Sequence, residues 1–328
     1  MAVLLRVDDL SVDVDTPAGP LHAVANVGFS VASGETLCLV GESGCGKTMT
    51  ALALMRLLPR RANVRGGTVT FEGRDLVSLG DAQMAALRGD RLGMIFQDPM
   101  TSLNPVFTIG DQLEEVYRRH RNAGRKEARE RAEYLLQRIG IMSPALRLSQ
   151  YPHELSGGLR QRMMIAMALM CGPSLIIADE PTTALDVTVQ VQILRLLVEL
   201  QREFRMALIL ITHNLGVVAR IADQVAVMYG GRIVEAGGAA DVFARPTHPY
   251  TRALLACVPV PGRTKQHGRL GSIPGIVPSL IGDVRGCAFR NRCDHARTAC
   301  AEKIAVHEAA PGHSVRCVLA ATEIAEAK

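Results

Sequence analysis

The chain has 328 residues, enough for one large domain and an appendix, because a domain usually takes about 100–200 residues. Hydrophobic residues make up 48% and charged residues 21%, a mixture that argues against an intrinsically disordered chain and predicts a sizeable core. The net charge of +5 is too modest to indicate a nucleic-acid partner, and the 4% of aromatic residues leaves few platforms for stacking bases.

The N-terminal sequence runs directly into a strand-like segment, Val3 to Val14, and contains no pattern typical of an export signal. The longest apolar run, residues 163–178, is interrupted by Gly172 and Pro173. It is also shorter than the roughly 20 residues that a membrane-spanning helix needs. We therefore expect a chain that does not cross a bilayer by itself.

The first predicted unit is a strand at Leu37–Val40, a glycine-rich loop and a helix over residues 48–58. Further strands are predicted at 68–71, 92–96, 175–178, 207–211 and 225–228, and helices at 81–88 and 187–204. Residues 108–140 are charge-rich with apolar residues at helical spacing, which predicts an inserted group of amphipathic helices. Strands that alternate with helices predict an α/β fold with a mostly parallel sheet covered on both faces.

After Arg245 the composition shifts to Pro, Gly, His and Cys, which predicts a domain boundary there. We expect a first domain at residues 1–245, with a helical subdomain at about 98–165. The second domain would be an extension at 246–328.

The loop after the first of these strands fits the phosphate-loop pattern GxxxxGK(S/T) and lies between a strand and a helix, as that pattern requires. Its residues are Gly41, Glu42, Ser43, Gly44, Cys45, Gly46, Lys47 and Thr48. Backbone amides of such a loop close around a triphosphate at the positive end of the helix. We expect Lys47 to reach the β- and γ-phosphates, Thr48 to bind Mg²⁺, and Cys45 to be only a small residue that fits.

An apolar strand at 175–178 is followed by two carboxylates, Asp179 and Glu180. At the carboxyl end of a strand they bring negative charge to a metal ion bound beside phosphates. We expect Asp179 to hold Mg²⁺, through water, and Glu180 to orient or deprotonate the attacking water. The alternative is an ordinary solvated turn.

The segment from Leu155 to Arg162 resembles the signature sequence of the ATP-binding-cassette (ABC) family. As in that family, it lies between the phosphate loop and the acidic strand end, so it narrows the class of phosphate-loop ATPase to which the chain is compared. The signature residues are Ser156, Gly157, Gly158 and Gln161. The resemblance implies a phosphate-loop nucleotide-binding domain whose signature contacts the ATP held by a second subunit.

Three further residues resemble functional positions of the same family. Gln97 resembles the glutamine that contacts Mg²⁺ and the attacking water, Asp186 the D-loop aspartate of the dimer interface, and His213 the histidine that touches the γ-phosphate. The family commonly stacks adenine on an aromatic residue, but Val14 stands near the expected place. Asn214 stands where related sequences often have Asp, a change that we expect to be tolerated.

The extension resembles that of dipeptide and oligopeptide importer ATPases, first through the segment HPYT at 248–251. Ile273-Pro-Gly and Gly286-Cys-Ala-Phe follow in the expected order. The resemblance implies an ATP-hydrolysing subunit at the cytoplasmic face of the plasma or inner membrane. Its implied partners are a second, homologous ATPase subunit, two permease subunits and a substrate-binding protein. Nickel-chelate, glutathione and opine importers use the same type of ATPase and stay open as alternatives.

Four cysteines cluster in the extension, at Cys287, Cys293, Cys300 and Cys317. Their spacing lacks the paired CxxC knuckles usual for structural zinc, and four thiolates suit a 4Fe-4S cluster as well as zinc. Simple buried or free thiols are a third possibility. The resemblance favours a 4Fe-4S cluster with a structural role.

Other classes fit the sequence less well. A chromosome-maintenance ATPase carries a coiled coil of hundreds of residues between phosphate loop and signature, whereas only residues 49–155 lie there in this chain. A translation-factor relative carries two cassettes. A non-transport iron–sulfur or nucleic-acid-binding ATPase would not need Gln97, Glu180 and His213 together.

Overall fold

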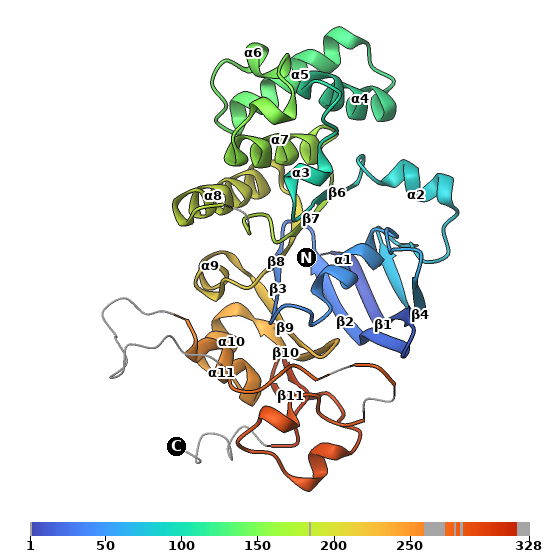
Figure 1. Cartoon of the computed structure of the whole chain (residues 1–328), viewed down its shortest axis with the longest axis vertical. Coiled ribbons are helices and arrows are strands. Elements are labelled where there is room, and N and C mark those ends of the chain that lie inside the picture. Colours follow the sequence, from blue (N-terminus) through green and yellow to red (C-terminus); the bar gives the residue numbers. More distant parts are fainter. Residues whose placement is uncertain (1, 184, 259–272, 279, 283–284, 320–328) are drawn as a thin grey trace. The chain divides into compact units, whose positions relative to one another are not determined.

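The computed structural model describes residues 2–183, 185–258, 273–278, 280–282 and 285–319 (Figure 1). Contacts between Cα atoms divide the chain into two compact units. Unit 1 consists of Met1–Leu4, Val31–Glu35 and Ser78–Ile211. Unit 2 consists of Leu5–Ser30, Thr36–Val77 and Thr212–Lys328. Each unit contains strands from the predicted parallel sheet.

In unit 1, three strands pair in parallel in the order β6, β7, β8. They are β6 (Leu92–Ile95), β7 (Leu175–Asp179) and β8 (Ala207–Thr212). All residues of β7 and β8 are buried, as expected for strands of a parallel sheet covered on both faces. The strands predicted at 92–96, 175–178 and 207–211 are therefore confirmed.

The helices of unit 1 include those predicted at 81–88 and 187–204 and within 108–140. They are α2 (Asp81–Leu87), α3 (Pro99–Ser102), α4 (Ile109–Arg121), α5 (Arg125–Arg138), α6 (Pro144–Leu148), the 3-10 helix η1 (Pro152–Glu154), α7 (Gly157–Leu169) and α8 (Val187–Phe204). Leu113 of α4, Leu135 of α5 and Ile139, directly after α5, are fully buried. The predicted amphipathic helices are thus present.

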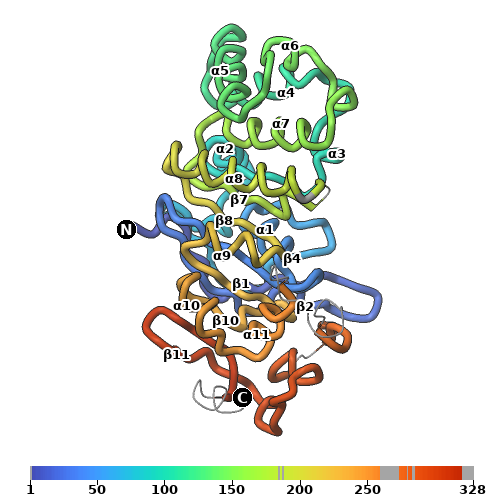
Figure 2. The backbone as a smooth tube through the Cα atoms, turned by 90° about the vertical axis from the view of Figure 1, so that its left-hand side faces the viewer, coloured from blue at the N-terminus to red at the C-terminus, as the bar shows by residue number. Residues whose placement is uncertain are grey.

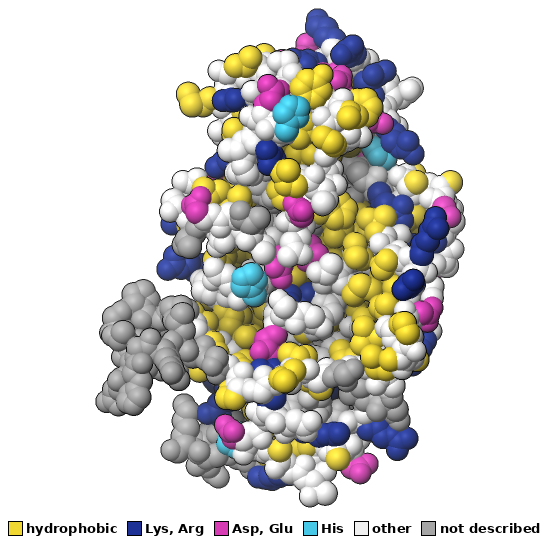
Figure 3. Space-filling model, in the orientation of Figure 1, with side chains coloured by type: hydrophobic (Ala, Val, Ile, Leu, Met, Phe, Trp, Pro, Cys, Tyr) yellow, Lys and Arg dark blue, Asp and Glu magenta, His cyan; other side chains and the backbone are white. Residues whose placement is uncertain are grey.

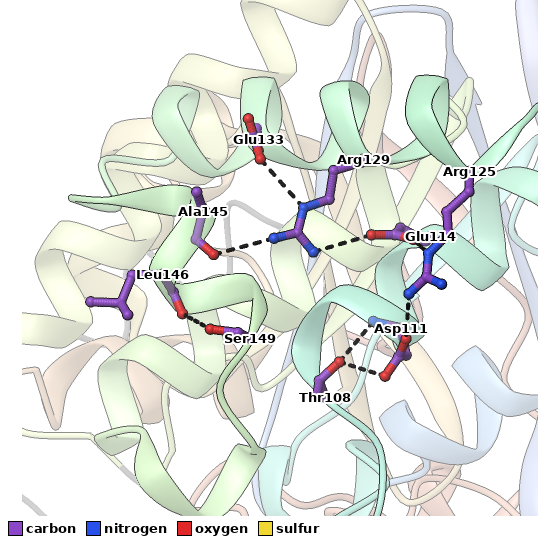
Figure 4. A network of polar contacts seen from close by, with 9 residues as sticks. All are labelled: Thr108, Asp111, Glu114, Arg125, Arg129, Glu133, Ala145, Leu146 and Ser149. Atoms are coloured by element: carbon purple, nitrogen blue, oxygen red, sulfur yellow. Dashed lines mark hydrogen bonds and ion pairs between the residues drawn. The ribbon is translucent and has the colours of Figure 1, made fainter.

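A polar network joins α4, α5 and α6 (Figure 4). Arg129 contacts the buried carboxylate of Glu114 at 3.3 Å and donates to the carbonyl of Ala145 at 3.3 Å. The last turn of α4 carries three arginines, Arg118, Arg119 and Arg121, which complement the negative end of the helix dipole. Figure 3 shows Lys and Arg side chains gathered over α4 and α5.

In unit 2, one sheet contains the order β11, β12, β10, β9, β3. Its strands are β3 (Thr36–Val40), β9 (Gln224–Tyr229), β10 (Arg232–Gly238), β11 (His307–Ala310) and β12 (His313–Val315). β3 and β9 are parallel, whereas β9, β10, β12 and β11 pair antiparallel. The C-terminal segment therefore adds strands beside β10, as Figure 2 also shows.

The second sheet of unit 2 contains the predicted strand-like segment 3–14 and the strand predicted at 68–71, but their pairing in a separate antiparallel sheet was not predicted. It has the order β2, β1, β4, β5 and its β1–β4 and β4–β5 pairs are antiparallel. Its strands are β1 (Val3–Thr16), β2 (Gly19–Ala32), β4 (Ala62–Phe71) and β5 (Arg74–Asp75). In β1, buried Leu5 and Val7 flank exposed Arg6, the alternation of a strand with one covered face.

The helices of unit 2 are shorter. They are α1 (Lys47–Leu54), α9 (Leu215–Ile221), α10 (Ala239–Ala244), α11 (Pro249–Ala256) and the 3-10 helices η2 (Arg290–Arg292) and η3 (Thr298–Ala301). The helix predicted over 48–58 ends at Leu54, because Arg56 adopts a left-handed φ of 50° and Pro59 follows. Among the described residues, no helix combines the length and the apolar character needed to span a membrane.

Candidate functional site: a phosphate loop and an acidic strand end

The phosphate loop connects β3 to α1 in unit 2 and depends on glycine at two tight positions. Gly41 has a φ of 155° and Gly46 a φ of 103°. A Cβ at Gly41 would collide with the carbonyl oxygen of Met228, and one at Gly46 with that of Ala23. Only glycine fits where the loop backbone passes so close to neighbouring strands.

Lys47 begins α1, and its side chain lies against the loop. It is 5% exposed, and its Nζ donates to the carbonyl oxygens of Gly41 at 2.9 Å and Glu42 at 3.0 Å. Ser43, Gly44 and Thr48 are exposed. The loop thus presents exposed backbone and a hydroxyl at the positive end of a helix, the arrangement that binds phosphate.

Cys45 is a buried member of this loop, 1% exposed. Burial raises the pKa of its thiol, although the charge of Lys47 acts in the opposite direction. The thiol therefore stays protonated near neutral pH, which agrees with its interpretation as a small residue that fits the loop.

Glu42 makes contacts that the sequence did not indicate. Its backbone N–H donates to the hydroxyl of Tyr250 at 2.9 Å. Its carboxylate is paired with the guanidinium of Arg292, at 2.7 and 3.0 Å. The sequence did contain one signal for such a contact. Glu42 is an acidic residue in a loop expected to bind anionic phosphate, and a negative charge there needs a cation beside it.

The acidic strand end lies in unit 1. Asp179, the last residue of β7, is 2% exposed. Glu180 has a left-handed φ of 43°, and its N–H donates to the carbonyl of Ile211 at 3.0 Å. Such a conformation in a non-glycine residue is strained and persists only where the surroundings hold it, as at many active sites.

The carboxylate of Glu180 contacts Thr183 and lies close to Gln97. Its Oε2 accepts from the hydroxyl of Thr183 at 2.8 Å and lies 3.5 Å from Nε2 of Gln97, at the limit of a hydrogen bond. Gln97 follows β6 and is exposed. The structure thus brings together the two residues predicted to act on the attacking water.

The signature and D-loop residues cap two helices of unit 1. Ser156 Oγ accepts from the N–H of Leu159 at 3.4 Å at the start of α7, and Asp186 Oδ1 accepts from Val189 at 3.0 Å at the start of α8. Ser156, Gly157 and Asp186 are exposed. Gln161 is instead 1% exposed, and its Nε2 has no hydrogen-bond partner among the described residues.

His213 comes directly after β8. It belongs to unit 2 and is exposed. The next residue, Asn214, caps α9 through its Oδ1, which accepts from the N–H of Val217 at 3.3 Å. Asn and Asp are equally good caps at this position of a helix, so the local structure explains how Asn replaces Asp here.

The four clustered cysteines line one narrow cavity of unit 2, together with His248 and His295. Cys300 and Cys317 are buried and the other two cysteines half-buried. Burial, together with the nearness of the other three thiols, raises the pKa of Cys287 to about 11. In the described part of the chain, however, no group of three or more His, Cys, Asp or Glu side chains is arranged to hold a metal ion.

His248 caps α11 and borders the same cavity. Its Nδ1 accepts from the N–H of Tyr250 at 3.0 Å, which places the proton of the neutral ring on Nε2. Burial lowers the pKa of the imidazole to about 3, so the ring is neutral at physiological pH. Nε2 is buried without a hydrogen-bond partner among the described residues.

The chain has a glycine-dependent loop of this sequence between a strand and a helix, and it has an acidic strand end. Together these features define a phosphate-loop nucleotide-binding protein.

A family model described as "ABC transporter" matches residues 24–183, and one described as "Oligopeptide/dipeptide transporter, C-terminal region" matches residues 234–300. The oligopeptide transport ATP-binding protein OppD of Escherichia coli is 50% identical over 96% of this chain and 92% of its own length. The dipeptide transport ATP-binding protein DppD of Bacillus subtilis is 49% identical over 92% and 89%, respectively.

Among solved structures, a bacterial ABC transporter cassette determined as a dimer aligns with a TM-score of 0.65 at 25% identity. The alignment covers 72% of this chain and 98% of the cassette. The chain belongs to the ABC transporter family. The predicted family and the predicted α/β fold class are both confirmed.

Proposed function

We propose that this chain is the ATP-binding and ATP-hydrolysing subunit of an ABC importer for dipeptides or oligopeptides. The observation that carries the proposal is the combination, in one chain, of the phosphate loop with an extension that matches the C-terminal region of oligopeptide/dipeptide transporters. Relatives about 50% identical over nearly their whole length bear the names of oligopeptide and dipeptide transport proteins.

In the proposed reaction, Lys47 leaves the loop carbonyls and binds the β- and γ-phosphates of ATP. Thr48, Asp179 and Gln97 would hold Mg²⁺, which would supply positive charge beside the phosphates. The remaining loop residues bind phosphate oxygens through their backbone amides.

Glu180 is the proposed catalytic carboxylate. It orients the water for in-line attack on the γ-phosphate and accepts its proton, and the contacts with Thr183 and Gln97 fix the direction of the carboxylate. His213 donates a hydrogen bond to the γ-phosphate oxygens as charge redistributes.

The exposed signature supports a second proposal, that two ATPase subunits close around two ATP molecules. Ser156, Gly157 and Gly158 would meet the ATP of the other subunit, with Gln161 supporting the helix behind them and Asp186 at the interface. A solved family member that is dimeric is consistent with this arrangement. The partner would be a second, homologous ATPase.

The other proposed partners are two permease subunits and, through them, an extracytoplasmic substrate-binding protein. The helical subdomain, at about 98–165, would contact the permease from the cytoplasmic face of the membrane. The boundary between a nucleotide-binding domain at 1–245 and an extension at 246–328 stays a prediction.

We also propose that Cys287, Cys293, Cys300 and Cys317 hold a 4Fe-4S cluster, with zinc as the alternative. The donors fit such a cluster in type and number, and all four line one cavity. The partnerless Nε2–H of His248, on the same cavity, could donate to a sulfur atom. Because the described side chains do not form a metal-binding arrangement, the thiols would have to turn toward one another. A bound cluster would cross-link the loops of the extension.

A glutamine at position 180 tests the catalytic assignment. Glu180→Gln keeps the shape of the side chain but cannot accept a proton, so we expect MgATP to bind as to the wild type while turnover falls about 10²- to 10⁴-fold. Glu199→Gln, on the exposed side of α8, is the matched control and should hydrolyse ATP normally. Steady hydrolysis by Glu180→Gln would refute the assignment.

The cluster proposal is tested by anaerobic purification with iron, sulfide and zinc analysis and an absorption spectrum. We expect iron, sulfide and broad visible absorption in the wild type, lost in Cys293→Ser and retained in Cys257→Ser, whose cysteine is also half-buried but lies outside the cavity. Zinc without sulfide would select the alternative, and the absence of any metal would reject both.

A further inference from the structure

An acidic side chain in the phosphate loop poses an electrostatic problem. The carboxylate of Glu42 belongs to the loop that receives the triphosphate, and an unpaired negative charge there would repel the phosphates. Its side chain is 25% exposed and pairs with a guanidinium that is only 4% exposed. A cation paired with Glu42 therefore favours anion binding by this loop.

The guanidinium belongs to Arg292, which lies in the extension directly before Cys293. Two of its nitrogens bond the two carboxylate oxygens of Glu42, at 2.7 and 3.0 Å, in the fork geometry that makes such pairs strong. The same group also donates to the carbonyls of Ile273 and Pro274, at 2.9 and 2.8 Å, and to the hydroxyl of Tyr229 at 3.2 Å. These bonds fix the guanidinium, so it acts as a rigid support for the loop.

A second contact from the C-terminal part holds the backbone of the same loop residue. The hydroxyl of Tyr250, a residue with no exposed surface, accepts the N–H of Glu42 at 2.9 Å. The ring of Tyr250 packs against those of Tyr229 and Phe289, at centroid distances of 4.6 and 5.3 Å. Side chain and backbone of Glu42 are thus both held by residues outside the loop.

We propose that Arg292 and Tyr250 are positioning residues through which the C-terminal extension sets the geometry and charge of the phosphate loop, and hence the affinity for a nucleoside triphosphate. Arg292 neutralises Glu42, and Tyr250 fixes the direction of one loop amide. The inference goes beyond the proposed function, because it makes the extension a determinant of nucleotide binding. It rests on that function only in requiring that the loop bind ATP.

The test is a double-mutant cycle on the dissociation constant for MgATP, with Glu42→Gln, Arg292→Gln and the double variant of the full chain. We expect Arg292→Gln to weaken binding at least about fivefold, a typical coupling between sites. Because the double variant has no unpaired carboxylate, it should bind more tightly than Arg292→Gln alone. Arg290→Gln is the control, since Arg290 lies on the same 3-10 helix and donates to the carbonyl of Arg285.

Additional measurements separate positioning from general destabilisation. Tyr250→Phe removes only the hydroxyl and keeps the ring packing, and it should also weaken MgATP binding while the thermal unfolding midpoint changes little. Hydrogen exchange of the loop amides, residues 41–48, should accelerate in Arg292→Gln and Tyr250→Phe but not in Arg290→Gln.

The outcomes distinguish this inference from the proposed function. A wild-type chain that does not bind MgATP would refute the proposed function. Normal MgATP affinity in folded Arg292→Gln and Tyr250→Phe, beside a wild type that binds, would overturn the inference alone. Additive effects in the double-mutant cycle would also overturn it, because they would mean that Arg292 does not act through Glu42.

Discussion

The buried carboxylate of Glu235, on β10, bonds to residues of β12 and of the segment before α11. Glu235 has no exposed surface. Its two oxygens accept the N–H groups of Thr247 and His248, at 2.7 and 2.9 Å, and Nε2 of His313 lies 2.7 Å from Oε1. One side chain therefore holds β12 and the residue that caps α11.

Glu235→Ala removes every one of these acceptors. Two backbone N–H groups and one imidazole would be left buried without this partner, and each such group costs about 1–3 kcal/mol. With three such groups, we expect a loss of at least about 3 kcal/mol in the free energy of unfolding. Glu235→Gln keeps the volume and one acceptor oxygen but points an amide N–H₂ at a donor, and it should cost about half as much.

Urea unfolding of the full chain measures the effect as a shift of the midpoint. Glu302→Ala, an exposed position in the extension, is the control and should change stability by less than about 0.5 kcal/mol. The reasoning would be refuted if Glu235→Ala unfolded at the same urea concentration as this control, because the bonds to Glu235 would then contribute nothing.

Two further predictions concern the signature and the thiols. The first uses a Glu180→Gln background, which retains ATP. Adding Ser156→Arg should abolish ATP-dependent association with a second ATPase subunit in sedimentation experiments, because a signature that meets the partner's ATP has no room for a large side chain. Unchanged association would show that Ser156 lies outside the interface. The second concerns alkylation at pH 8, which should label Cys257 in the native chain but leave Cys38 and Cys45 unmodified until the chain unfolds. Burial raises the pKa of the Cys38 and Cys45 thiols and denies access to the reagent. If mass spectrometry found Cys38 or Cys45 labelled in the native chain, their buried placement would be contradicted.

Local patterns predicted much of the fold. The helix at 187–204 was predicted at its observed bounds, since its apolar residues keep a helical period over five turns. The segments 3–14 and 68–71 were predicted as strands, but their antiparallel pairing in one sheet with β2 and β5 was not, although β1 does alternate buried and exposed residues at Leu5, Arg6 and Val7. Alternation indicates a strand with one covered face, but it does not identify the strand's partners.

In the candidate site, too, local patterns predicted some residues and missed others. Lys47 and Glu180 could be predicted because each belongs to a short motif whose chemistry depends on neighbouring residues. The contacts of Glu42 with Tyr250 and Arg292 join residues 208 and 250 positions apart, respectively. No local pattern specifies such pairs, because they arise from tertiary packing of the extension.

The most direct test of the central claim is peptide uptake by the reconstituted transporter. Proteoliposomes would contain this chain with its partner ATPase and permeases, MgATP inside, and the substrate-binding protein with a labelled oligopeptide outside. The account predicts that the peptide accumulates with the wild type and not with Glu180→Gln, and that excess nickel chelate, glutathione or opine does not compete. ATP hydrolysis without peptide accumulation, or equal accumulation with Glu180→Gln, would contradict it.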